Sequence, residues 1–104
     1  MREICLARLD KTRPALILTR AAAGAAMTKV TIAPITSTIN GLSSEVRLGP
    51  ANGLDHDCVV ALDNALTVPV SALGRTVGHL TDSQEAELAR AIVLAYDLEL
   101  PLLG

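Results

Sequence analysis

Residues 30–37, Val-Thr-Ile-Ala-Pro-Ile-Thr-Ser, limit the possible folds of this chain more than any other stretch. β-Branched residues dominate it, and apolar side chains are interleaved with hydroxyls, a pattern typical of a β-strand. Pro34 has no backbone N–H to donate to a sheet, so we expect the strand to be bulged or exposed there. The strand then ends in two hydroxyl side chains, Thr36 and Ser37, and a polar turn follows. A rigid strand that ends in hydroxyl donors is suited to chemistry on a negatively charged group.

Short apolar stretches separated by turn residues make up most of the remaining chain. Residues 3–9 and 14–20 flank a turn at 10–12 and predict a β-hairpin. Residues 21–27 are rich in alanine around a glycine, which makes a short helix there marginal. Further strands are expected at residues 28–36, 45–48, 58–62, 66–70 and 76–80.

The clearest helix begins after Thr81, which is placed to form a capping box with Gln84. One apolar stripe follows at helical spacing, formed by Leu88, Ala91, Ile92 and Ala95. An apolar tail occupies residues 98–104. Many short strands followed by one helix predict an α+β fold, a small curled antiparallel sheet or barrel capped by the C-terminal helix.

The composition indicates one domain with an aliphatic core. The 104 residues are enough for a single domain over residues 1–104, half of them are apolar, and Tyr96 is the whole aromatic content. No apolar run approaches the roughly eighteen residues of a membrane helix, and the N-terminus does not resemble a secretory signal. Cys5 and Cys58 form no CxxC pair, so we favour buried reduced thiols over a disulfide or a reactive role and expect a cytoplasmic protein.

Charge is distributed unevenly along the chain, although the net charge is only −2. Residues 1–30 contain six basic and two acidic residues, a balance of +4, and the remainder contains three basic and nine acidic residues, a balance of −6. A basic half suggests a face for a polyanion, and a solvated surface with accidental asymmetry is an equal alternative.

Few residues carry a chemical signal on their own. Arg13 precedes Pro14 at the start of a strand, and its guanidinium matches phosphate oxygens, although such an arginine is often ordinary. Asp63 and Asn64 end a buried strand, where a turn cap is the alternative. Asp55-His56-Asp57 is compatible with a metal site, but we favour a charged turn and expect neither metal nor cofactor. His79 reads as a half-exposed sheet residue.

Four segments in order resemble the MazF/PemK toxins over nearly the whole chain. They are Arg13-Pro14-Ala15-Leu16-Ile17-Leu18, residues 30–37, residues 53–64 with Thr67-Val68, and Gly74-Arg75-Thr76-Val77-Gly78-His79-Leu80-Thr81. The resemblance implies an SH3-like antiparallel β-barrel with a C-terminal helix, forming a homodimer. It also implies a metal-independent endoribonuclease that cuts single-stranded RNA (mRNA, rRNA or tRNA) at short sequences. Such toxins belong to type II toxin–antitoxin modules and are neutralised by a cognate MazE-like antitoxin.

The resemblance also implies site residues. Arg13 matches the catalytic arginine of the family, Thr36 its catalytic threonine, and Asp63 an acidic position proposed as the base. Around them we assign substrate binding to Lys11, Ser37, Thr38, Asn40 and Asn64. A ribose 2′-OH would attack the adjacent phosphate to give a 2′,3′-cyclic phosphate and a 5′-OH end, with Arg13 neutralising the developing charge.

This chain departs from most family members in its first hairpin. Asp10-Lys11-Thr12 runs directly into Arg13, so a longer loop with its glutamate is missing, and the chain is most similar to a short-loop actinobacterial subgroup. The alternative function is a non-enzymatic toxin on the same fold, like the CcdB toxins that trap DNA gyrase. That action relies on a tryptophan near the C-terminus, and this chain has no tryptophan.

Overall fold

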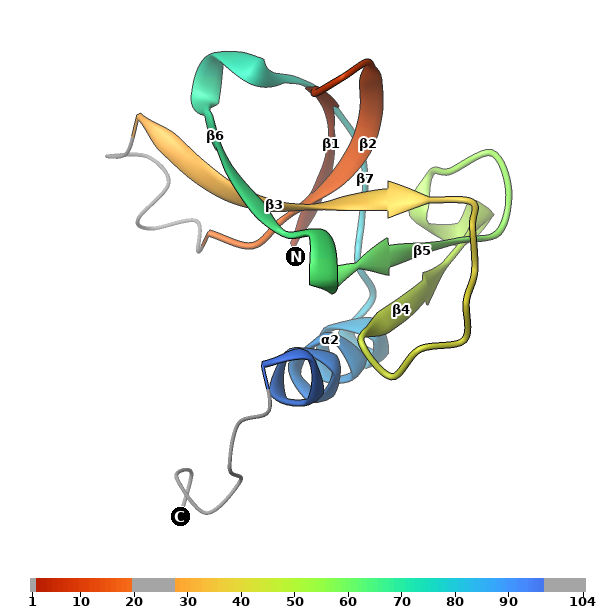
Figure 1. Ribbon diagram of the computed structural model, residues 1–104. Helices are drawn as coiled ribbons and strands as arrows, with labels where there is room; N and C mark the ends of the chain where they lie inside the picture. Colours follow the sequence, from red (N-terminus) through yellow and green to blue (C-terminus); the bar gives the residue numbers. More distant parts are fainter. Residues whose placement is uncertain (1, 20–27, 97–104) are drawn as a thin grey trace.

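The computed structural model describes residues 2–19 and 28–96, and shows a curled antiparallel sheet with a helix packed against one end (Figure 1). The strands are β1 (Glu3–Arg8), β2 (Thr12–Ile17), β3 (Lys29–Thr36), β4 (Glu45–Leu48), β5 (Cys58–Ala61), β6 (Leu66–Pro69) and β7 (Leu73–His79), and the helix is α2 (Asp82–Ala95). Three short 3₁₀ turns connect them: η1 (Pro50–Asn52), η2 (Leu62–Asn64) and η3 (Val70–Ala72). The predicted α+β fold, a curled antiparallel sheet with a C-terminal helix, is confirmed.

The strand β3 is the centre of the sheet, whose order is β4-β5-β3-β2-β1-β7 with β6 also on β3. Its first half pairs with β6 from Lys29 to Ile32, and its end pairs with β5 through Ile35 and Thr36. Pro34 lies between these two stretches, where β3 exchanges one neighbour for the other. The predicted bulge or exposure at Pro34 is wrong, because Pro34 is half-buried and opposes Ala15 of β2 within a continuous register.

The hairpin predicted for the first two strands is confirmed, with Arg13 opposite Ala7 and Pro14 opposite Leu6. The second strand is displaced from the prediction, since β2 begins at Thr12 rather than residue 14. As a result Arg13 lies inside the strand, where the β1 pairing fixes its backbone. The predicted short helix at 21–27 and the apolar tail at 98–104 lie outside the described residues.

Two aliphatic clusters form the core, as expected for a chain without Phe or Trp. The larger cluster joins the sheet to α2 and includes Ile4, Leu16, Val60, Leu80 and Leu88. The smaller one fills the curled part of the sheet and consists of Ala7, Ala15, Val30, Ile32 and Val68. No helix in residues 2–19 and 28–96 is both long and apolar enough to cross a membrane.

Polar contacts fix α2 against the sheet. The predicted capping box is present: the Gln84 N–H donates to Thr81 Oγ1 at 3.2 Å, and the Thr81 N–H donates to Gln84 Oε1 at 3.0 Å. Arg2 pairs with Glu85 at 3.0 Å and also donates to the carbonyl of Leu18. Arg2 therefore anchors the helix, so its charge is not free to add to the polyanion-binding face suggested by the basic residues in 1–30.

The loop after η1 lies directly on β7. Gly53 has φ +84°, and a Cβ there would overlap the carbonyl oxygen of Val77. A Cβ on Gly78 would in turn overlap the carbonyl oxygen of Asn52. These two glycines let the two backbones touch, and this contact places residues 53–56 beside the end of β3.

Candidate functional site

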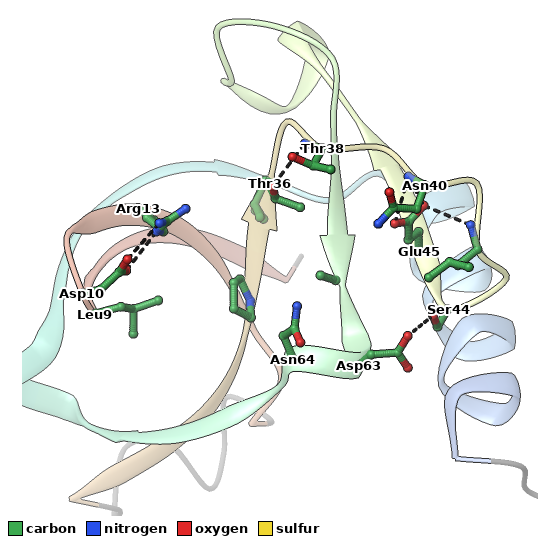
Figure 2. Close-up of a pocket in the computed structure, with 14 residues that line it drawn as sticks. Leu9, Asp10, Arg13, Thr36, Thr38, Asn40, Ser44, Glu45, Asp63 and Asn64 are labelled. Atoms are coloured by element: carbon green, nitrogen blue, oxygen red, sulfur yellow. Dashed lines mark hydrogen bonds and ion pairs between the residues drawn. The ribbon is translucent and has the colours of Figure 1, made fainter.

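The larger of two described cavities, the first cavity, has a volume of about 430 Å³ and lies beside the end of β3 (Figure 2). Its lining comes from the β1–β2 hairpin, β3, the segment from Thr38 to Glu45, the end of β5 and η2. Six of the eight predicted site residues line it: Arg13, Thr36, Thr38, Asn40, Asp63 and Asn64. Lys11 and Ser37 do not; they are exposed next to residues that do.

Arg13 is the one basic side chain among the lining residues, and Asp10 holds its guanidinium from one side. Nε donates to Asp10 Oδ1 at 3.1 Å and Nη2 to Asp10 Oδ2 at 3.0 Å. The hydrogen bonds from Arg13 lower the pKa of the Asp10 carboxyl, and the same pair raises the pKa of Arg13. A guanidinium has five N–H groups, so two bonds to Asp10 leave three donors for a ligand in the cavity.

Asp10 is a site residue that the sequence reasoning missed. The i, i+3 spacing across the tight turn is the signal that places Asp10 beside Arg13. The carboxylate is exposed and the arginine is more buried, with exposed fractions of 71% and 35%. Asp10 therefore orients Arg13 from the solvent side rather than neutralising it in the interior.

Thr36 is the last residue of β3, and its hydroxyl faces the segment that follows. Its Oγ1 accepts a hydrogen bond from the Thr38 N–H at 3.1 Å. Because the oxygen accepts this bond, the hydroxyl hydrogen remains to donate elsewhere. Thr36 thus presents a donor with an oriented oxygen at the edge of the cavity (Figure 2).

Asp63, in η2, lies across the first cavity from Arg13 (Figure 2). The buried Ser44 hydroxyl donates to Asp63 Oδ2 at 2.7 Å, which leaves Oδ1 to accept a further proton or hydrogen bond. Nothing in the sequence marks Ser44 as a site residue, because its partner Asp63 is nineteen positions away. A cation, a hydroxyl donor and an oriented carboxylate are therefore brought to one cavity.

Glu45 shapes the cavity wall that runs through Asn40 and Leu42. Its Oε1 accepts hydrogen bonds from the backbone N–H groups of Asn40, Gly41 and Leu42, at 3.2, 2.8 and 3.1 Å. Three successive N–H groups can converge on one oxygen because Gly41 has φ +75°. Glu45 is a positioning residue, although from the sequence it is expected only as the first residue of the strand at 45–48.

The residues considered for a metal are separate from the first cavity. Within residues 2–19 and 28–96, no three His, Cys, Asp or Glu side chains come together as a metal-binding group. Asp55, His56 and Cys58 instead line a second cavity, which shares Ile35 and Thr36 with the first. His79 is exposed at the end of β7, and its carbonyl accepts a hydrogen bond from Asn52.

Comparisons with known proteins identify close relatives of the chain. Residues 3–96 match the family model described as "PemK-like, MazF-like toxin of type II toxin-antitoxin system". The chain is similar to endoribonuclease MazF3 of Mycobacterium tuberculosis, with 52% identity over 99 residues that cover 95% of this chain and 96% of the relative.

Comparison with solved structures also finds toxins and endoribonucleases of similar fold. The chain is similar to Mycobacterium tuberculosis toxin MazF-mt6, with a TM-score of 0.92 and 51% identity over 94% of this chain and 99% of that one. An endoribonuclease in complex with its cognate antitoxin, from a mycobacterial species, shares the fold with a TM-score of 0.84 at 24% identity, over 95% of each chain.

Proposed function

This chain belongs to the PemK-like, MazF-like toxins of type II toxin–antitoxin systems and is an endoribonuclease of that kind, and we propose that it cleaves single-stranded RNA in the first cavity. The observation that carries the proposal is the convergence of Arg13, Thr36 and Asp63, from three separate elements, on one cavity. These three residues are the ones that the resemblance matched to catalytic positions of the family.

The proposed reaction is an internal transfer at phosphorus. The ribose 2′-OH loses its proton and attacks the adjacent phosphate, the bond from phosphorus to the 5′-oxygen breaks, and the leaving 5′-oxygen takes up a proton from solvent. The products carry a 2′,3′-cyclic phosphate and a 5′-OH. Negative charge builds on the phosphate oxygens in the transition state. Arg13 stabilises that charge with the N–H groups not bound to Asp10, and the Thr36 hydroxyl donates to the same oxygens.

Asp63 is the proposed general base. Ser44 fixes one of its carboxylate oxygens, so the other is oriented to accept the proton of the 2′-OH. Because the 2′-OH is the nucleophile, DNA is not a substrate. Asn40, Thr38 and Asn64 supply hydrogen-bonding groups for the bases or ribose, and the exposed Lys11 and Ser37 extend this surface.

The proposal extends to the biological setting. Cleavage at short sequences in mRNA, rRNA or tRNA blocks translation and growth, which places the protein in the cytoplasm. The chain acts as a homodimer, which covers the edges of the small sheet, and a MazE-like antitoxin with an acidic segment competes with RNA for Arg13. Endoribonuclease relatives at 52% identity favour this function over the CcdB-like binding of gyrase.

The test is cleavage of a mixed-sequence single-stranded RNA, with an all-DNA copy as the negative substrate. We expect Arg13→Ala and Thr36→Ala to lose about 10²–10³ in rate, because each removes a transition-state donor, and Thr36→Ser to lose less. Arg47→Ala is the matched control, since Arg47 is exposed on β4 and lines neither cavity. Wild-type rates for folded Arg13→Ala would refute the assignment.

The same assay tests metal independence. The proposed groups supply charge stabilisation and proton transfer without a metal ion, so cleavage should continue at the same rate in excess EDTA. Activity that EDTA abolishes and Mg²⁺ or Mn²⁺ restores would contradict the proposed chemistry.

A further inference from the structure

The second cavity has a volume of about 300 Å³ and, like the first, is lined by the end of β3. Ile35 and Thr36 line both cavities, so the proposed catalytic hydroxyl is part of the wall between them. The remaining lining comes from β1, β2, β7, β5 and the loop that the Gly53–Val77 contact holds in place. A chain bound at Thr36 therefore lies next to both cavities.

The second cavity combines an apolar floor with a polar rim. Leu6, Pro14, Leu54 and Val77 line it, and each is only half-buried, so apolar surface is open to a ligand. Asp55, His56 and Arg75 line it as exposed residues. An apolar floor with a few polar groups at the rim is typical of a small-molecule site, and this volume is at the lower end of the usual range of about 300–1,000 Å³.

Arg75 is the basic residue of this rim. In the described part of the chain its side chain makes no hydrogen bond or ion pair, unlike those of Arg2, Arg8 and Arg13, so its guanidinium donors are open to a ligand of this cavity. A planar guanidinium and an imidazole are groups on which unpaired bases stack. Tyr96, the single aromatic residue, lies at the end of α2 and lines neither cavity.

We propose that the second cavity binds the base of the RNA nucleotide next to the scissile phosphate, with Arg75 and His56 against that base. This inference rests on the proposed function, because it takes the scissile phosphate to lie at Arg13 and Thr36. The base enters the apolar floor, and its edge contacts the polar rim. Recognition of this base contributes to the sequence preference of cleavage.

The experiment maps cut sites of the wild-type protein in a long RNA of mixed sequence, by capturing the new 5′-OH ends. Arg75→Ala and His56→Ala are compared with Arg47→Ala, the exposed arginine control. We expect the two variants to lose base preference at one position beside the cut and to lose about 10-fold in kcat/KM on the preferred site. The preference at other positions should remain, and Arg47→Ala should match the wild type.

Binding is measured separately with an oligonucleotide of the mapped sequence that carries a single 2′-deoxy sugar at the cut, which prevents cleavage. In ¹H–¹⁵N spectra we expect shifts at the amides of residues 53–58 and 75–77 that Arg75→Ala abolishes. Unchanged base preference in both variants, or shifts confined to the first cavity, would overturn the inference. Weaker self-association or antitoxin binding in Arg75→Ala, with unchanged cleavage, would overturn it as well and assign the cavity to a protein contact.

Failure of this inference and failure of the proposed function give different results. If the wild type does not cleave RNA, or Arg13→Ala cleaves as well as the wild type, the proposed function is wrong. If the wild type cleaves and Arg13→Ala does not, while Arg75→Ala and His56→Ala keep the full base preference, only the assignment of the second cavity is wrong.

Discussion

Replacing Glu45 with alanine should loosen the wall of the first cavity without unfolding the protein. Its carboxylate accepts hydrogen bonds from the backbone N–H groups of three consecutive residues, Asn40 to Leu42. A hydrogen bond to a charged group contributes about 1.5–3 kcal/mol when water cannot replace it. Here the three N–H groups belong to exposed residues, so water replaces much of the loss. We therefore expect a cost of about 1–2 kcal/mol in total, near that of one such bond.

That cost can be measured globally and locally. For a domain of this size it lowers Tm by about 4–16 °C, and the loop amides should exchange about 10-fold faster or more with solvent. Cleavage should fall as well, because Asn40 and Leu42 line the cavity. Glu45→Gln keeps one acceptor oxygen and should lose less. Glu87→Ala, on the exposed face of α2, is the control. Wild-type exchange rates at residues 40–42 in Glu45→Ala would refute the reasoning.

Two further predictions concern the scaffold. Gly78→Ala should cost about 3 kcal/mol or more of folding free energy and lower Tm by at least about 12 °C, because the new Cβ overlaps the Asn52 carbonyl. The control is Gly74→Ala in the same strand, whose Cβ meets Leu6 at an ordinary 3.4 Å and which should leave Tm nearly unchanged. Equal Tm values for the two variants would contradict this account. Burial raises the pKa of both the Cys5 and the Cys58 thiol above the ordinary value of 9.0, so folding favours the neutral thiols. Their contribution to stability is present below the pKa of the thiol in the unfolded chain. It is lost as pH rises through the pKa of the thiol in the folded protein. Urea midpoints should fall more between pH 8 and 10 in the wild type than in a variant with both cysteines replaced by alanine, and equal slopes would show that the thiols play no part.

Local sequence signals were sufficient for most of the secondary structure. Thr81 and Gln84 define the start of α2 because a capping box satisfies orphan N–H groups within four residues. The Asp-Lys-Thr turn similarly predicted the first hairpin. Interactions of this kind depend on neighbours in the sequence, so a single chain contains the information needed to find them.

The point at which a strand changes its neighbouring strand cannot be predicted from local sequence. Pro34 was expected to disturb β3, but the structure places it where β3 leaves β6 and meets β5. The N–H that Pro34 lacks would lie where β3 changes its neighbouring strand, and the tertiary fold determines that position. A local pattern cannot report which strand lies alongside, so the proline was recognised as unusual and its consequence was misjudged.

The candidate site shows the same division. Arg13, Thr36 and Asp63 stood out by residue type and by resemblance, whereas Asp10, Ser44 and Glu45, which orient these residues and the cavity wall, were not predicted as site residues. Ser44 contacts Asp63 across nineteen positions of sequence, a pairing that only the fold reveals. Residues that orient other side chains make no direct contribution to the proposed chemistry, so their residue type alone does not identify them in the sequence.

Under the proposed function, the position of Thr36 would let a small domain combine cleavage with sequence preference. Residue 36 is the last of β3, and its neighbour Ile35 is buried and fixed against Val60 of β5. The hydroxyl thus stands on the central strand of the sheet, at residues that line both cavities. Under the two proposals, an RNA chain held at this point would meet charge stabilisation in the first cavity and an apolar floor in the second. Because both cavities share the end of β3, a base that fits the second cavity would also bring its phosphate toward Arg13.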